Sequence, residues 1–193
     1  MKKITVFCGS SDGNESVFQE QAVALGEALV KRNIGLVYGG AKVGLMGAIA
    51  DAVLKGGGEV FGVLPKFLGT KEVAHDNLTD LFLVETMHER KMLMNDLCDG
   101  VIALPGGFGT MEELFEMLTW GQLGLHSKPV AILNTDGYYD DLIELVDKMV
   151  VAGFLKKLNQ EMLLVDTDAA SLLDQMENYD PPKVAKWITK DQV

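Results

Sequence analysis

The sequence predicts a single α/β domain, in which helices cover both faces of a parallel sheet. Short apolar runs rich in β-branched residues alternate with longer segments of helical periodicity, which is the order of elements in such a fold. Glycine clusters follow three of the runs, after Cys8, Tyr38 and Leu104, where parallel strands present their carboxyl ends to a ligand. The 193 residues suit one domain. Right-handed crossovers make the expected fold a doubly wound, Rossmann-like parallel sheet.

Each expected element follows from its own pattern. The first strand is a compact apolar run that ends in a turn cluster, and the first helix places apolar side chains at helical spacing. The expected strands are residues 4–8, 34–38, 60–64, 81–84, 101–104, 130–133 and 162–165. The expected helices are residues 18–29, 45–54, 87–97, 110–123, 139–151 and 169–176. Residues 66–80 have the least regular pattern, and the Pro181-Pro182 pair separates a domain at 1–180 from a short tail at 181–193.

The charge of the chain argues against large anionic partners. It carries 17 Lys and Arg against 28 Asp and Glu, a net charge of −11, so we expect neither nucleic acid nor a membrane as partner. A small anion can still bind, because a nest of backbone N–H groups does not depend on net charge. Cys8 and Cys98 are far apart, and the first apolar run is too short for a secretion signal. We therefore expect free thiols and a cytoplasmic location.

The strongest local signal is the segment Pro105–Glu113, which runs from an expected strand into an expected helix. Its three glycines let the backbone expose N–H groups where the helix dipole is positive, an arrangement that suits a phosphate. The segment is neither a Walker A loop nor a G-x-G-x-x-G fingerprint. Thr110-x-x-Glu113 also matches a capping box, in which Glu113 returns to the N–H of Thr110. The structural and functional roles of Glu113 can coexist.

Three weaker signals have ordinary structural explanations as well. The Gly39–Gly47 segment fits close packing of a helix on a strand, and the Gly9–Gly13 segment fits a turn. Arg90 and Lys91 fit either an anion site, through the bidentate fork of arginine, or a solvated basic pair on a helix. His88-Glu89 begins like a zinc motif, but a methionine stands at the second histidine position, so no metal site is expected.

Taken together, these motifs resemble the Lonely Guy family of cytokinin riboside 5′-monophosphate phosphoribohydrolases over nearly the whole chain. The diagnostic pair of motifs is intact: Met87-x-x-Arg90-Lys91 and Pro105-Gly106-Gly107-x-Gly109-Thr110-x-x-Glu113. Further matches are Cys8-Gly9-Ser10-Ser11, Val37-Tyr38-Gly39-Gly40, Gly44-Leu45-Met46-Gly47, Trp120-x-Gln122-Leu123-Gly124 and Gly137-Tyr138-Tyr139-Asp140. Two departures are Ala41, where the family often has a third glycine, and Phe18, where a tyrosine is common.

The resemblance implies a hydrolase that cleaves the N-glycosidic bond of N6-modified adenosine 5′-monophosphates. The implied products are the free base, a cytokinin or adenine, and ribose 5-phosphate. The resemblance also implies that no cofactor or metal is needed and that the chain forms a homodimer with the active site near the interface. Arg90 and Glu113 are the implied catalytic residues. The expected substrate-binding residues are Gly9, Ser10, Gly39, Gly40, Arg90, Lys91, Gly106, Gly107, Phe108, Gly109, Thr110, Met111, Glu112, Glu113 and Thr119.

Cleavage of such a bond develops positive charge at C1′ of the ribose, and a nearby carboxylate stabilises that charge or activates the attacking water. Glu113 suits this role if the glycine loop holds the 5′-phosphate. Three alternatives stay open. A pyridoxal-phosphate decarboxylase needs a Schiff-base lysine, and no residue identifies one. A nucleotide or cofactor carrier needs the loop but not the pair of Arg90 and Glu113. A salvage hydrolase would act on AMP or other purine monophosphates.

Overall fold

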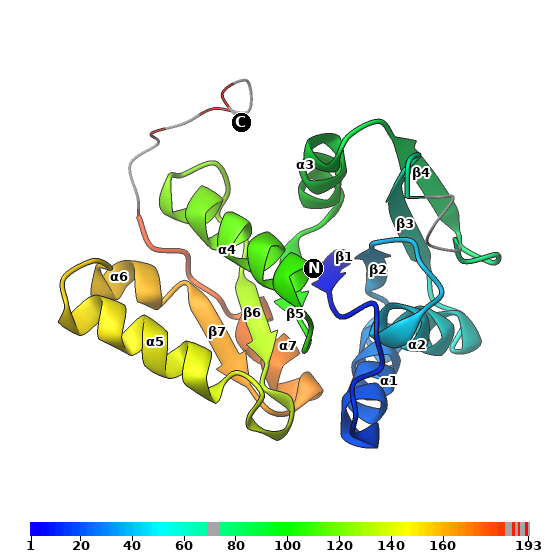
Figure 1. The fold of residues 1–193 in the computed structure, drawn as a ribbon, viewed down its shortest axis with the longest axis horizontal. Coiled ribbons are helices and arrows are strands. Elements are labelled where there is room, and N and C mark those ends of the chain that lie inside the picture. Colours follow the sequence, from blue (N-terminus) through cyan, green and yellow to red (C-terminus); the bar gives the residue numbers. More distant parts are fainter. Residues whose placement is uncertain (69–73, 184–186, 188, 190–191, 193) are drawn as a thin grey trace.

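The computed structural model describes residues 1–68 and 74–183, together with residues 187, 189 and 192 (Figure 1). Its strands are β1 (Lys3–Phe7), β2 (Gly35–Tyr38), β3 (Val60–Pro65), β4 (Asp80–Val84), β5 (Gly100–Ala103), β6 (Val130–Leu133) and β7 (Leu163–Asp166). Its helices are α1 (Ser16–Lys31), α2 (Gly44–Lys55), α3 (Met87–Leu97), α4 (Phe108–Gln122), the 3₁₀ turn η1 (Thr135–Gly137), α5 (Asp140–Val151), α6 (Lys157–Gln160) and α7 (Ala169–Glu177). Every expected strand and helix is present. No helix in this described part is long and apolar enough to cross a membrane.

The strands form one parallel sheet of seven strands in the order β4-β3-β2-β1-β5-β6-β7, which confirms the doubly wound fold. The chain winds outward from β1 to β4, then returns to the middle and winds the other way from β5 to β7 (Figure 1). The direction changes between β1 and β5, and ligands bind at such a point in open α/β sheets. The register pairs Phe7 with Ala103, so the loops that follow these two strands start side by side.

The two faces of the sheet carry separate apolar layers. Helices α1, α2 and α7 contribute to the layer on one face, and α3, α4 and α5 contribute to the layer on the other. Alternation along β1 divides its side chains between them, since Ile4 and Val6 belong to the first layer and Phe7 belongs to the second. Strands buried on both faces read as continuous apolar runs, which is why the sequence predicted them.

Two short elements lie outside the sequence prediction. In η1, Asp136 and Gly137 have φ angles of 50° and 70°, so the chain makes a left-handed turn there. Helix α6 is one turn, too short to show a helical period. Of the irregular segment 66–80, residues 69–73 lie outside the described residues, and β4 begins at its last residue. The boundary at residue 180 stays a prediction, because 184–186, 188, 190–191 and 193 also lie outside the described residues.

Candidate active site

The candidate site lies where β1 and β5 separate the two halves of the sheet. Three loops meet there: residues 8–13 after β1, 39–43 after β2 and 104–107 after β5. The N–H of Gly9 donates to the carbonyl oxygen of Pro105 at 3.0 Å and ties the first loop to the third. The first and third loops enclose a cleft of about 290 Å³ together with α2, α3 and α4. The cleft is lined by Cys8, Gly9, Ser10, Met46, Met87, Arg90, Gly107, Phe108, Gly109, Thr110, Glu112 and Glu113.

Helix α4 begins at Phe108, two residues before the expected start, with Gly107 as its N-cap. No side chain in the described part of the chain caps this helix, and Thr110 lies inside it, so the capping box of Thr110 and Glu113 is wrong. Because the helix starts earlier, Glu113 lies in its second turn, away from the free N–H groups of the first. Those N–H groups have no partner within the helix. Their residues line the cleft, so backbone donors and the positive end of a helix dipole are available to an anion.

Arg90 and Glu113 approach each other from α3 and α4. Arg90 Nη1 lies 3.6 Å from Glu113 Oε1, and the two side chains are 11% and 10% exposed. The interpretation of Arg90 as a solvated surface residue is therefore wrong. Arg90 Nε is buried and has no hydrogen-bond partner among the described residues. An unsatisfied guanidinium N–H beside a cleft is available to donate to a bound ligand.

Gly39 gives Arg90 the space that it occupies. A Cβ at this position would lie 2.3 Å from Arg90 Nη2 and 3.0 Å from Met46 Sδ, so a side chain there would displace the guanidinium. Ala41, the departure from the family pattern two residues later, fits without strain. Among the described residues only Asn33 and Asp136 are non-glycine residues with positive φ, so the backbone at Ala41 does not require a glycine.

Burial raises the pKa of Glu113 from 4.5 to about 7. The loss of water around the carboxylate is the largest cause; the charge of Arg90 opposes it, and the charges of Glu112 and Glu116 add to it. Burial also raises the pKa of the Cys8 thiol, and the negative charge of Glu113 raises it further, so this thiol is neutral. A cleft carboxyl that titrates near neutral pH is typical of a catalytic group.

Lys91 is ion-paired and does not line the cleft. Its Nζ lies 2.6 Å from Glu112 Oε1 and 2.9 Å from Glu116 Oε1. Burial lowers the pKa of Lys91, but hydrogen bonds to the two carboxylates outweigh burial and raise the pKa overall. In this structure Lys91 therefore connects α3 to α4. None of the described residues that line the cleft is a lysine. A Schiff base requires a neutral amine, which neither the lining nor Lys91 offers.

Four other expected site residues lie away from the cleft. Gly106 lines a neighbouring hollow. Gly40 does not line the cleft, and its carbonyl oxygen accepts from the N–H of His75 at 3.0 Å. Met111 packs into the second apolar layer. Thr119 lies farther along α4 in a separate groove of about 180 Å³ between α4, α5 and α6. The structure of the single chain thus brings Arg90, Glu113 and the glycine-rich residues beside them together, while Thr119 lies the farthest along α4 in its own groove.

The neighbouring hollow, of about 300 Å³, shares part of its glycine-rich wall with the cleft. Tyr138 lines this hollow, and its hydroxyl donates to the carbonyl oxygen of Gly106 at 2.6 Å. Tyr138 and the cleft residues Met46 and Met87 stand in motifs quoted for the family resemblance, but they were not among the expected site residues. A usable signal existed for Tyr138, because it follows a predicted strand at the edge where ligands bind.

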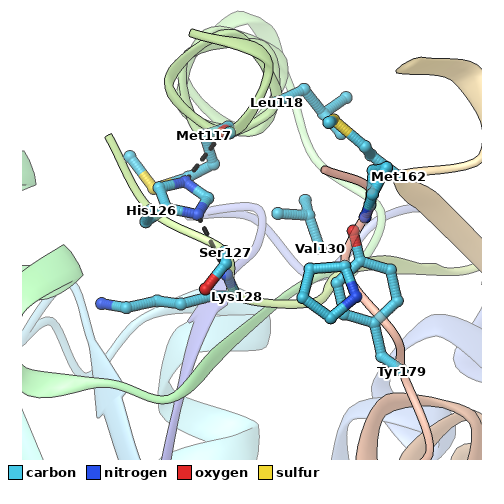
Figure 2. Close-up of a pocket in the computed structure, with 11 residues that line it drawn as sticks. Met117, Leu118, His126, Ser127, Lys128, Val130, Met162 and Tyr179 are labelled. Atoms are coloured by element: carbon cyan, nitrogen blue, oxygen red, sulfur yellow. Dashed lines mark hydrogen bonds between the residues drawn. The ribbon is translucent and has the colours of Figure 1, made fainter. Parts of the chain in front are cut away.

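Figure 2 shows another pocket, beside the start of β6, in which His126 has a structural role. Its Nε2 lies 2.9 Å from the carbonyl oxygen of Met117, and its Nδ1 accepts from the N–H of Lys128 at 3.2 Å (Figure 2). Burial lowers the pKa of His126 to about 4, so the ring is neutral. Across the described residues no group of three or more metal-ligating side chains occurs.

Comparison with known proteins gives matches over most of the chain. The model of a family described as "Possible lysine decarboxylase" matches residues 46–176. A cytokinin riboside 5′-monophosphate phosphoribohydrolase of Arabidopsis thaliana is 47% identical over 98% of this chain and 88% of its own. A probable cytokinin riboside 5′-monophosphate phosphoribohydrolase of Oryza sativa subsp. japonica is 51% identical over 92% of this chain and 79% of its own.

Solved structures share the architecture. The protein TM1055 superposes with a TM-score of 0.71 at 22% identity and covers 93% of this chain and 100% of its own. The molybdenum cofactor carrier protein of Chlamydomonas reinhardtii superposes with a TM-score of 0.67 at 18% identity, over 92% of this chain and 99% of its own. At these identities the likeness shows the fold alone, so the resemblance to a carrier says nothing of function.

Proposed function

The chain belongs to the family of the cytokinin riboside 5′-monophosphate phosphoribohydrolases, and from this premise we infer that it hydrolyses the N-glycosidic bond of N6-modified adenosine 5′-monophosphates. The products are the free base and ribose 5-phosphate. The observation that carries the proposal at this site is the buried pair of Arg90 and Glu113, 3.6 Å apart, beside the start of α4. A carrier needs the glycine loop but has no use for this pair.

The 5′-phosphate binds at the start of α4. Backbone N–H groups from Gly107 to Thr110 supply the donors, and the helix dipole supplies positive potential. The net charge of −11 does not prevent binding, because these fixed dipoles act at short range. Binding of the 5′-phosphate orients the attached ribose. The binding energy of the phosphate therefore helps to place C1′ beside Glu113.

Glu113 acts on the reacting carbon. As the base leaves, positive charge develops at C1′, and the ionised carboxylate stabilises this charge or takes a proton from the attacking water. The water supplies a hydroxyl to C1′ and a proton to the departing base, so the atoms of one water molecule are divided between the two products. Ionisation of Glu113 is therefore necessary for turnover.

Arg90 has two functions in this proposal. Its charge lowers the pKa of Glu113 against the effect of burial, so that a useful fraction of the carboxyl is ionised near neutral pH. Its buried Nε, which has no partner in the described residues, donates to an oxygen of the ribose or phosphate. Both functions require the guanidinium to stay in the space beside Gly39.

A homodimer in the cytoplasm completes the proposal. The groove around Thr119 is bounded by α5, of which only Val146 is buried. Val151, the last residue of α5, is 90% exposed, and Phe154, three residues after it, is 89% exposed. A second copy seated on this face covers the apolar surface and places Thr119 near the partner's cleft. The two cysteines are free and buried, which supports a reducing compartment.

The decisive experiment incubates the purified chain with AMP and with N6-isopentenyl-AMP and separates the products by chromatography. We expect free base and ribose 5-phosphate in equal amounts, and the ratio of the two rates gives the preferred base. Glu113→Gln should lose about 100-fold or more in turnover while AMP binding survives. Glu112→Gln is the matched control, because this neighbouring carboxylate is 55% exposed and should matter far less.

Other results would favour the alternatives. Wild-type activity retained in Glu113→Gln would contradict the role of this carboxylate. Nucleotide binding without release of a base would favour a carrier. An absorbance band of an internal aldimine would favour a pyridoxal-phosphate enzyme. Equal rates on AMP and N6-isopentenyl-AMP would favour a salvage hydrolase without a preference for modified bases.

A further inference from the structure

Three consecutive carbonyl groups of the loop between β5 and α4 each accept a hydrogen bond from outside the loop. Leu104 O accepts from the hydroxyl of Tyr139 at 2.7 Å. Pro105 O accepts from the N–H of Gly9 at 3.0 Å. Gly106 O accepts from the hydroxyl of Tyr138 at 2.6 Å. Hydrogen bonds thus hold the carbonyl groups of the loop, while the residues that follow it, Gly107 to Thr110, line the cleft.

The two tyrosines are presented by the turn after β6. Asp136 adopts φ 50°, an uncommon conformation for a residue with a side chain, and Gly137 adopts φ 70°. Asn134 Oδ1 then accepts from the N–H of Tyr139 at 2.8 Å, and fixes the start of α5. The Tyr138 ring packs edge-on against Tyr139, with ring centroids 5.0 Å apart. This turn therefore holds both hydroxyls against the neighbouring loop.

Tyr138 differs from Tyr139 in its surroundings. Tyr139 is 1% exposed and belongs to the second apolar layer, so its packing alone explains its presence. Tyr138 is 46% exposed, yet its hydroxyl makes a short hydrogen bond to the loop beside the cleft. Its ring also packs edge-on against Phe18 of α1, with centroids 5.9 Å apart. A half-exposed tyrosine contributes little to the core, so the hydrogen bond of its hydroxyl is the contact that needs a functional explanation.

The planarity of the peptide connects this hydroxyl to the cleft. The carbonyl of Gly106 and the N–H of Gly107 belong to one trans peptide unit, so they point in opposite directions. A donor that holds the carbonyl on one side fixes the direction of the N–H on the other. A Cβ at Gly106 would lie 2.1 Å from Thr110 Oγ1 and 2.8 Å from Gly9 N, so the loop packs closely against these two residues.

We propose that Tyr138 is a positioning residue for phosphate recognition: its hydroxyl holds the Gly106–Gly107 peptide so that the N–H of Gly107 is aimed at the 5′-phosphate. The inference rests on the proposed function and deepens it. It means that the turn after β6 contributes to the affinity for the ribose 5-phosphate part of the substrate. Tyr138 acts through the loop and contacts neither the base nor the scissile bond.

Tyr138→Phe tests this inference, because it removes the hydroxyl and keeps the ring that packs on Phe18. Calorimetry with ribose 5-phosphate should give a dissociation constant about fivefold higher than that of the wild type, the effect of one hydrogen bond. KM for AMP should rise by a similar factor, while kcat and the thermal unfolding midpoint change little. Tyr179→Phe, at the pocket beside the start of β6, is the matched control and should leave all four quantities unchanged (Figure 2).

The outcomes separate this inference from the function on which it rests. Wild-type turnover of AMP together with an unchanged ribose 5-phosphate affinity in Tyr138→Phe would overturn the inference alone. A lower unfolding midpoint with reduced kcat and unchanged affinity would also overturn it, because it would indicate a purely structural tyrosine. A wild-type chain that neither binds ribose 5-phosphate nor hydrolyses AMP would overturn the proposed function and the inference together.

Discussion

Glu113 shows how burial and a neighbouring charge compete at a single carboxyl. The guanidinium of Arg90, 3.6 Å away, favours the ionised form, and the loss of water around a side chain that is 10% exposed favours the neutral one. Burial prevails, and the pKa of Glu113 rises to about 7. The carboxyl is therefore close to half-ionised at neutral pH, so small changes in its surroundings alter the active fraction.

The pH profile of activity should report this carboxyl. Because the ionised form is the active one, kcat/KM should rise with pH and level off above an inflection near pH 7. Glu112→Gln should move the inflection to lower pH, since the charge of Glu112 is one of the causes that raise the pKa of Glu113. Steady-state rates between pH 5 and 9 give both curves.

The substrate phosphate also titrates in this range, and the comparison separates the two groups. An inflection that belongs to the phosphate would stay at the same pH in Glu112→Gln. An unchanged profile in this variant would therefore contradict the assignment to Glu113.

The free energy of unfolding should also depend on the protonation of Glu113, and it should fall over the pH range in which activity rises. The folded chain binds the Glu113 proton more tightly than the unfolded chain, so the free energy of unfolding falls as pH rises from 4.5 to about 7. Glu113→Gln lacks this titration, and all other groups are shared by both proteins. The stability of the variant relative to the wild type should therefore increase between pH 5 and pH 8 in urea denaturation. A difference independent of pH would mean that burial does not shift this pKa.

At the scale of elements, one lysine connects the two helices that carry the catalytic pair. Lys91 of α3 contacts Glu112 and Glu116 of α4, and its side chain is 11% exposed. Glu116 is 20% exposed, so water does not readily replace it as a partner. Glu116→Gln should lower the free energy of unfolding by about 1–3 kcal/mol, because a buried ammonium loses a charged partner.

The matched control for this substitution is an exposed pair on α5. Glu144 and Lys148 lie 3.0 Å apart with side chains 64% and 68% exposed. Glu144→Gln should change stability by less than about 0.5 kcal/mol. Equal effects of Glu116→Gln and Glu144→Gln in urea denaturation would show that the contact between α3 and α4 has no special weight.

The sequence pattern predicts the strands of this fold but not the start of α4. The strands were predictable because burial on both faces leaves a continuous apolar run. The start of α4 was not, because Gly109 has low helix propensity and Thr110-x-x-Glu113 resembles a capping box, so the pattern predicted a start at Thr110. The residue before this boundary accepts a hydrogen bond from a distant loop, that of the Tyr138 hydroxyl to the carbonyl oxygen of Gly106, which no local pattern shows. The pairing of Lys91 likewise depends on the spacing of two helices, which no local pattern encodes.

At the scale of the whole molecule, strand order determines which loops form the site. Residues of four segments far apart in the sequence meet because they follow β1, β2, β4 and β5, which are parallel strands of one sheet, so their carboxyl ends lie at one edge. The motifs quoted for the family resemblance fall largely on this edge, and the resemblance named Arg90 and Glu113 together as catalytic residues. Their contact at 3.6 Å comes from the structure, because the sequence left the partner of Arg90 open. Thr119 is the exception, because its groove lies elsewhere on α4.

Thr119 serves a nucleotide site only if another surface meets it, and the proposed homodimer supplies one. The exposed apolar side chains at the end of α5 should then be buried between two copies, so Phe154→Asp should produce a monomer in size-exclusion chromatography with light scattering. Turnover should fall with the dimer, since each cleft would lose the partner's contribution. Leu83→Asp is the control, because Leu83 is 56% exposed on β4 at the opposite edge of the sheet from β7. A monomeric wild type, or a fully active Phe154→Asp monomer, would contradict a role for Thr119 across an interface.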